Sequence, residues 1–291
     1  MTAGRGTASA RRTAGPGKAS SPKRPQPLRE AELSQVRVVL TDVDGTLTTK
    51  GLLLGSTIDA LAALRDAGIR VGLVSGRPAG WGECWARTLP VEAVVVENGG
   101  LTFIWREGRL VKHYAEPEGE RERNRARLRR EIARVMKEFP QARLSSDSAY
   151  TEVDLAIDHN EEVKLPPGTA RELEALLQGR GVKAVRSSVH VNCWLGDFDK
   201  RSASFRLLSD EWGLRPRPSD ARVVYAGDSF NDAPMFEAVR LSVGVANVRA
   251  VLGEIACAPA YVTRAEEGHG FEELARAILA QRRERRGRVR R

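Results

Sequence analysis

Short apolar runs recur along the chain and are separated by segments with helical spacing. The runs VRVVL at 36–40, IRVGLVSG at 69–76 and EAVVVENGG at 92–100 are rich in β-branched residues and almost free of charge. Such runs are typical of strands that are covered on both faces. Between the first two, residues 56–68 have helical spacing. Strand, helix and strand in this order predict parallel βαβ units.

The helix at 56–68 has recognisable ends. Ser56 and Asp59 have the spacing of a capping box, and Gly68 is placed as a helix stop. The βαβ pattern returns after Lys200. There the sequence predicts helices at about 200–212, 231–239 and 269–284, and strands at 222–227 and 241–246.

The segment between these two halves has a different pattern. LTFIW and RLVKHY flank REG and predict a hairpin, and a charged helix follows at about 118–138. The pattern then predicts a strand in TEVDLAID, a helix at about 168–178, and strands in VKAV and SVHVNCW. This order is typical of an α+β unit.

Two strands of this unit alternate between polar and apolar residues. Glu152, Asp154 and Asp158 share one face of the first strand, and Ser188, His190 and Asn192 share one face of the second. We expect helices to cover the apolar side of this sheet, and the polar side to face a ligand.

The fold class is therefore α/β: a doubly wound, mainly parallel sheet with an inserted α+β cap domain. About two domains also fit the length of 291 residues. The predicted boundaries are a disordered basic tail at 1–35, a core formed by 36–100 and 196–281, a cap at 101–195, and a second basic tail at 282–291.

The net charge of +9 changes this picture little. Residues 1–29 carry +7 and residues 282–291 carry +6, so the remaining chain is close to −4. Basic tails can bind polyanions, but solvated charge is the simpler interpretation, and nucleic acid is not the expected partner.

No apolar run is long enough for a membrane span or a signal peptide, which favours a cytoplasmic protein. Three widely separated cysteines argue against disulfides or a zinc site.

Reactive residues follow the ends of the predicted core strands. Asp42 and Asp44 follow the first, Ser75 and Gly76 the second, Asn98 the third, and Asp228 a later one. Asp232 lies one helical turn beyond Asp228, and Lys200 begins a helix. Open parallel sheets bind ligands at these strand ends. Crowded carboxylates need a cation, and Mg²⁺ with a phosphoryl group fits this donor set.

These residues suggest separate chemical roles. Asp42 can attack phosphorus, and Asp44 can exchange protons with the leaving group and with water. Ser75, Lys200 and the metal can neutralise the transferring phosphoryl group. Alone, Ser75 would be a helix cap and Lys200 a surface lysine. A calcium loop is excluded because its required Gly and Glu positions hold Leu47 and Leu53.

The motifs DVDGT, SGR, Lys200 and GDSFND occur in the order and spacing of the haloacid dehalogenase-like phosphatases, which this chain resembles from about residue 36 to 265. ENGG before the insertion resembles the class IIB branch, with its Cof-like, sucrose-phosphate and mannosyl-3-phosphoglycerate phosphatases. The resemblance implies Asp42 as nucleophile and Asp44 as acid and base. It also implies Mg²⁺ held by Asp42, the Asp44 carbonyl and Asp228, with Asp232 supporting the metal site.

Further residues are predicted to bind the substrate. They are Thr46, Gly76, Arg77 and Asn98 in or beside the motifs, and His190 and Asn192 in the cap. The two cap residues have a simpler interpretation as satisfied polar groups of the sheet.

The predicted function is that of a Mg²⁺-dependent phosphomonoesterase for a small phosphorylated metabolite, with a sugar phosphate favoured. Two alternatives remain at this point: a sugar phosphomutase of the same branch, and a nucleic-acid-associated protein that docks through its tails. The sequence leaves the substrate and the oligomeric state open.

Overall fold

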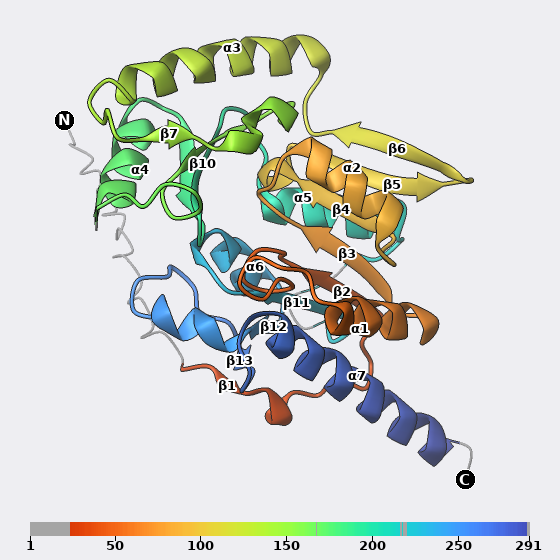
Figure 1. Ribbon diagram of the computed structural model, residues 1–291. Helices are drawn as coiled ribbons and strands as arrows, with labels where there is room; N and C mark the ends of the chain where they lie inside the picture. The colour runs from red at the N-terminus through yellow and green to blue at the C-terminus, as the bar shows by residue number, and fades with distance from the viewer. Residues whose placement is uncertain (1–23, 167, 216, 218–219, 290–291) are drawn as a thin grey trace, which may run out of the picture.

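The computed structural model describes residues 24–289, apart from 167, 216 and 218–219. Its larger sheet has nine strands in the order β1-β13-β12-β11-β2-β3-β4-β5-β6 (Figure 1). Neighbouring strands are parallel from β1 to β4, and β5 and β6 add an antiparallel hairpin at one edge. The strands are β1 Gln26–Pro27, β2 Val38–Thr41, β3 Arg70–Val74, β4 Ala93–Val96, β5 Leu101–Arg106, β6 Arg109–Tyr114, β11 Val223–Gly227, β12 Leu241–Gly244 and β13 Tyr261–Val262.

Helices cover both faces of this sheet, as the doubly wound prediction requires. One face is buried by α1 (Gly55–Asp66), α2 (Ala79–Thr88) and α7 (Glu267–Val289). The other face is buried by α5 (Lys200–Arg206) and α6 (Ala233–Ala238). Alternate residues of one strand enter the two cores: Val39 lies in the first, and Val38 and Leu40 lie in the second. The α/β fold class is confirmed.

A second sheet, with its own apolar core, lies beside the larger one (Figure 1). Its strand order is β7-β8-β10-β9, and all its pairs are antiparallel. Helices α3 and α4 pack on its apolar side through Leu128, Ile132 and Leu173. The elements are α3 Glu118–Val135, β7 Arg143–Leu144, β8 Leu155–Asp158, α4 Thr169–Gly179, β9 Lys183–Arg186 and β10 His190–Trp194. We call residues 118–195 the cap unit.

Three sequence predictions need correction. The hairpin of β5 and β6, expected within the insertion, extends the larger sheet, because Leu101–Ile104 pair with β4. Residues 24–35 of the expected disordered tail are ordered: β1 pairs with β13, and Leu33 is fully buried. The other part of that tail, 1–23, lies outside the described residues.

The third correction concerns the start of α1. The helix begins at Gly55, and its N-cap Leu54 makes no side-chain capping bond. The hydroxyl of Ser56 donates instead to the carboxylate of Glu272 on α7, 2.7 Å away. A contact between two helices has therefore replaced the local cap. Gly68 does follow the helix in the left-handed conformation (φ +73°), as predicted for a stop.

The order of the strands creates one special position. From β2 the chain proceeds to β3 on one side, whereas β11 pairs with the other side of β2 and leads to β12. The carboxyl ends of β2 and β11 therefore form a topological switch point, where open α/β sheets bind ligands. In the part of the chain that the structure describes, no helix has the length and apolarity to cross a bilayer.

Candidate active site

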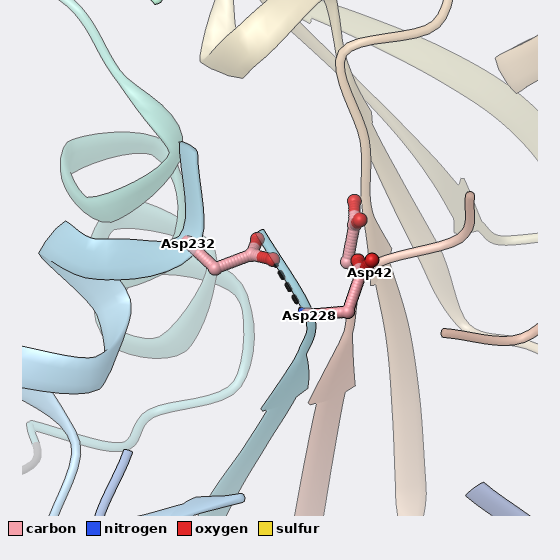
Figure 2. A group of neighbouring side chains, drawn as sticks. All are labelled: Asp42, Asp228 and Asp232. Carbon is pink, nitrogen blue, oxygen red and sulfur yellow. Dashed lines mark hydrogen bonds between the residues drawn. The ribbon is translucent and has the colours of Figure 1, made fainter. Parts of the chain in front are cut away.

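Three buried carboxylates meet at the switch point. Asp42 follows β2 directly and Asp228 follows β11, so both project from adjacent strand ends (Figure 2). Asp232 reaches the same point from the turn before α6. One carboxylate oxygen from each of the three lies within 4.8 Å of the others. The structure thus brings together the carboxylates of three of the four aspartates that the sequence predicts at the metal site.

A buried lysine links two of these carboxylates. Lys200 Nζ donates to Asp42 Oδ1 and to Asp232 Oδ1, at 2.8 Å each, and its side chain is only 2% exposed. Asp199 caps α5 by accepting the N–H of Ser202, so the helix begins where Lys200 points into the site. The interpretation as a surface lysine is therefore wrong.

The carboxylate of Asp232 is fully engaged within the protein. Its Oδ2 accepts the backbone N–H groups of Asp228 and Ser229, at 2.9 and 3.1 Å. Its Oδ1 accepts the hydroxyl of Tyr225 at 2.5 Å, besides Lys200. A Cβ at Gly227 would lie 2.6 Å from this carboxylate, which explains the glycine. Asp232 fixes the backbone and the position of its neighbours.

The carboxylate of Asp228 is held from the other side. Thr46 Oγ1 donates to its Oδ1 at 3.2 Å, and Asn247 Nδ2 donates to its Oδ2 at 3.0 Å. Asn247 also bonds the carbonyl of Gly45. Gly45 has φ +73°, and a Cβ there would lie 2.6 Å from Asp228 Oδ2. The turn after Asp44 therefore needs glycine for its conformation and for the close approach of Asp228.

Burial makes the negative charges of this cluster costly. It raises the pKa of Asp42 to about 7, although Lys200 opposes the shift, and it raises the pKa of Asp228 well above its usual range. Burial works against the charged form of Lys200, but Asp232 and Asp42 raise its pKa. One lysine does not compensate three buried carboxylates. A hard divalent cation fits this all-oxygen donor set and would offset the excess negative charge.

Other predicted residues gather at the end of β3. Ser75 is fully buried, and its hydroxyl accepts the N–H of Arg77 at 3.0 Å. A Cβ at Gly76 would lie 3.0 Å from Asn192 Nδ2 and 3.1 Å from Asn98 Oδ1. The cap residue Asn192 therefore reaches the core loop. Asn98 Nδ2 donates to Asp154, while Asn98 Oδ1 is buried and has no hydrogen-bond partner within the described part of the chain.

Arg77 connects the core to the cap unit. Its Nη2 and Nε donate to the two carboxylate oxygens of Asp44, at 2.8 and 2.9 Å. The same guanidinium pairs with Glu161 at 2.6 Å and with Asp147 at 3.4 Å, both in the cap unit. Burial works against its charge, yet Asp44 and Glu161 raise the pKa of Arg77 above its ordinary value. His190 Nε2 completes the cluster, 2.8 Å from Glu161 Oε2.

Two further carboxylates position these parts. Asp158, which we expected to face a ligand, instead accepts four backbone N–H groups from residues 160–163 and so fixes the loop that carries Glu161. Glu97 is fully buried, and its carboxylate accepts the N–H groups of Ala79 and of residues 152–154. Glu97 thus joins the core to the segment before β8.

Sequence reasoning missed several of these residues. Asn247 follows the carboxyl end of β12, so the expectation that ligands bind at these strand ends could have identified it as a site residue. Tyr225 lies inside a buried strand, where nothing in the pattern distinguishes its hydroxyl. Asp147 and Glu161 lie in irregular segments of the cap unit, and their ion pairs with Arg77 depend on the tertiary fold.

A hollow between the cap unit and the core lies beside Lys200 and Asn98. It has a volume of about 460 Å³ and is lined by Asn98, Lys200 and Asn231 from the core and by residues such as Ala184 and Trp194 from the cap unit. Its wall is mainly apolar apart from the polar groups at the site. Such a space admits a small molecule.

Comparisons with known proteins agree with this architecture. Residues 39–121 match the family model of haloacid dehalogenase-like hydrolases. Phosphoglycolate phosphatases of Methanopyrus kandleri and Pyrobaculum neutrophilum are each 28% identical to this chain; the first alignment covers 83% of this chain and 97% of the relative, the second 84% and 96%.

Solved structures share the fold at lower identity. A protein of Thermoplasma acidophilum superimposes with a TM-score of 0.62 at 20% identity, over 84% of this chain and 98% of that one. The sucrose-phosphatase of Synechocystis superimposes with a TM-score of 0.60 at 16% identity, again over 84% and 98%. By its motifs and these similarities the chain resembles the haloacid dehalogenase-like hydrolases, its relatives are named as phosphatases, and the solved structures share its fold.

Proposed function

We propose that this protein is a Mg²⁺-dependent phosphomonoesterase that acts on a small phosphorylated metabolite through an aspartyl-phosphate on Asp42. One observation carries the proposal: Asp42 ends β2 at the switch point, with Lys200 on one carboxylate oxygen and the Asp228 carboxylate beside it. Asp44 follows two residues later and is fixed by Arg77.

The metal would be held by Asp42 and Asp228, with the backbone carbonyl of Asp44 added by the family resemblance. A bound Mg²⁺ would neutralise negative charge on the phosphoryl oxygens. Asp232 acts as a positioning residue rather than a ligand, because both of its oxygens already accept protein hydrogen bonds.

In the first step, the free carboxylate oxygen of Asp42 attacks phosphorus and the bond to the ester oxygen breaks. Lys200 holds the other oxygen of Asp42 and so orients the attacking one. Asp44 in its protonated form gives its proton to the leaving oxygen, which departs as an alcohol. In this proposal Lys200 and Ser75 stabilise the negative charge of the transferring group.

In the second step, Asp44 takes a proton from a water molecule, whose oxygen attacks the phosphorus of the aspartyl-phosphate. The bond between phosphorus and Asp42 breaks, phosphate leaves, and both carboxyl groups return to their starting states. The bidentate contact with Arg77 positions Asp44 while it is a carboxylate, the form that takes the proton from water.

The cap unit restricts the substrate. Because Arg77, Glu161 and His190 bridge the core and the cap, the site accepts small molecules rather than polymers. A sugar phosphate is the substrate expected from the sequence. The archaeal relatives are named for phosphoglycolate. Arg77 and His190, which contact the carboxylate of Glu161, could bind the carboxylate of such a substrate in its place.

The test is release of inorganic phosphate from 2-phosphoglycolate and from a panel of sugar phosphates, with and without Mg²⁺. The proposal predicts stoichiometric phosphate and alcohol products. Isomerised sugar phosphate formed in the presence of a sugar bisphosphate, without phosphate release, would establish the phosphomutase alternative instead.

A further inference from the structure

A row of arginines lies at the opposite end of the sheet from the active site. Arg37, Arg222 and Arg240 each directly precede a strand, namely β2, β11 and β12. They therefore lie at the amino ends of the parallel strands, whereas Asp42 and Asp228 lie at the carboxyl ends. Strands of four or five residues separate the two ends by roughly 15 Å.

Three neighbouring hollows at this end share lining residues. The largest, about 880 Å³, is lined by Gln35, Arg215 and Arg217 together with Arg222 and Arg240. The second, about 410 Å³, shares Gln35 with the first and adds Arg37 and arginines of α7. The third, also about 410 Å³, shares residues of α7 with the second. We call the surface that these three hollows form the arginine groove.

The α7 side of the groove continues the positive charge. Arg285 and Arg286 are exposed there, and Arg282 and Arg283 line the same stretch. Among the described residues that line the three hollows, nine are arginines and two, Asp66 and Asp220, are acidic. Asp220 is paired with Arg222 at 2.6 Å. The groove therefore keeps a large positive excess, although the chain between the tails is slightly negative.

One arginine of the groove is incompletely bonded. Arg282 Nη1 is buried and has no hydrogen-bond partner among the described residues. Burial, together with Arg286 and Arg37, lowers the pKa of Arg282. A buried, unpaired donor beside like charges is costly, and an anion bound in the groove would relieve that cost.

The lining indicates which anion fits. Arginine binds phosphate oxygens in bidentate fashion, and here the arginines are spread over three neighbouring hollows instead of converging on one point. Aromatic residues, on which exposed bases would stack, are missing from the described lining. The exposed large apolar side chains, such as Leu52 and Trp105, lie outside it, which argues against insertion into a lipid surface.

We propose that the arginine groove binds the phosphate backbone of a nucleic acid duplex, independently of sequence. This binding function is separate from phosphatase activity, because the groove and the carboxylate cluster occupy opposite ends of the sheet. It also places nucleic acid binding in the folded body of the protein, whereas the sequence suggested only the tails for it.

The test is fluorescence anisotropy of the full-length protein with labelled RNA and DNA duplexes of about 20 base pairs, two helical turns. We expect both duplexes to bind, with affinity falling about 10³-fold between 50 and 200 mM salt, as for six phosphate contacts. Reversing two charges, in Arg285→Glu/Arg286→Glu, should weaken binding at least about tenfold and reduce the salt slope by about 2.

The matched control is Arg129→Glu/Arg130→Glu, which makes the same charge change at exposed arginines of α3. It should bind as the wild type does. A full-length variant with the Lys and Arg residues of positions 1–23 changed to Gln should keep the groove's binding. Phosphate release from a small ester should be equal in all these variants, which shows that they are folded.

Several results would overturn the proposal. They are equal loss in the groove and control variants, loss only in the tail variant, or binding to phosphatidylserine vesicles without binding to the duplexes. Because duplex binding is read separately from phosphate release, failure of the proposed enzymatic function would leave this test intact.

Discussion

The guanidinium of Arg77 holds both carboxylate oxygens of Asp44, at 2.8 and 2.9 Å, while it also pairs with Glu161 of the cap unit. The group that we propose as acid and base is thus tied through one side chain to the part of the protein that covers it. A substitution of Glu161 in the cap unit should therefore affect both substrate binding and the position of Asp44.

Glu161→Gln should improve the use of an acidic substrate. The variant removes the carboxylate that competes for Arg77 and His190, so KM for 2-phosphoglycolate should fall by about fivefold, roughly 1 kcal/mol. KM for p-nitrophenyl phosphate, which lacks a carboxylate, should change less. Glu162→Gln is the control, because the neighbouring carboxylate of Glu162 accepts the exposed hydroxyl of Ser146 rather than contacting Arg77 or His190. Equal changes in KM for both substrates would refute the idea that Glu161 competes with the substrate carboxylate.

Lys200→Met should destabilise the metal-free protein. Removal of the ammonium leaves Asp42 and Asp232 buried without their cation, and the free energy of unfolding should fall by about 3–5 kcal/mol. Urea unfolding in chelator measures this loss. Arg201→Met, at the exposed neighbouring position, should lose less than about 1 kcal/mol. Similar losses of unfolding free energy in the two variants would mean that the buried ion pairs of Lys200 do not stabilise the protein more than an exposed pair does.

The core elements were predictable because their signals are local. Runs such as 69–76 are apolar on both faces, and parallel sheets place the residues that follow them at one edge. This rule alone brings Asp42, Ser75 and Asp228 together. The start of α1 was not predictable, since Ser56 bonds Glu272, which is 216 positions away in the chain.

The cap contacts were only partly predictable. Alternation correctly placed His190 and Asn192 on a polar face. Asn192 approaches Gly76 of the core, and His190 contacts Glu161, which pairs with Arg77. The same alternation could not show that Asp158 bonds four nearby N–H groups, because that turn follows the strand and has no periodic pattern. The ordered part of the expected tail was not predicted for a related reason. Strand β1 has two residues, too few to show an alternation of polar and apolar positions.

Asp154→Asn should change how stability depends on pH. Asp154 is buried beside Glu97, and burial followed by the Glu97 charge raises its pKa well above 3.8. Glu97 accepts four backbone N–H bonds that favour its charged form, so Asp154 is the member of the pair that keeps a proton.

The sign follows from linkage. A raised pKa in the folded state stabilises the protein below the unfolded pKa, near 3.8, and this stabilisation is lost as pH rises through the folded pKa. Urea unfolding from about pH 4 upward should show wild-type stability falling relative to Asp154→Asn, by at most about 1.4 kcal/mol per pH unit. Asp197→Asn, at an exposed site, should follow the wild type. Parallel curves for Asp154→Asn and wild type would contradict the assignment.

Removal of divalent cations should abolish turnover and lower the melting temperature. A cation that binds only the folded protein stabilises it by about 2.7 kcal/mol at one hundred times its Kd. Thermal unfolding with and without Mg²⁺ measures this difference, and Asp228→Asn should respond much less than the wild type, since it lacks one carboxylate of the cluster. Full activity in excess chelator would exclude the metal site.

The role of Asp42 as nucleophile is tested most directly by kcat for phosphate release in Asp42→Asn, with circular dichroism as the check on folding. The amide cannot supply the attacking oxygen anion, so kcat should fall by about 10⁴-fold or more. The matched variant Asp59→Asn, at an exposed position of α1, should keep wild-type kcat. A folded Asp42→Asn protein with kcat within about tenfold of the wild type would contradict catalysis through an aspartyl-phosphate at this residue.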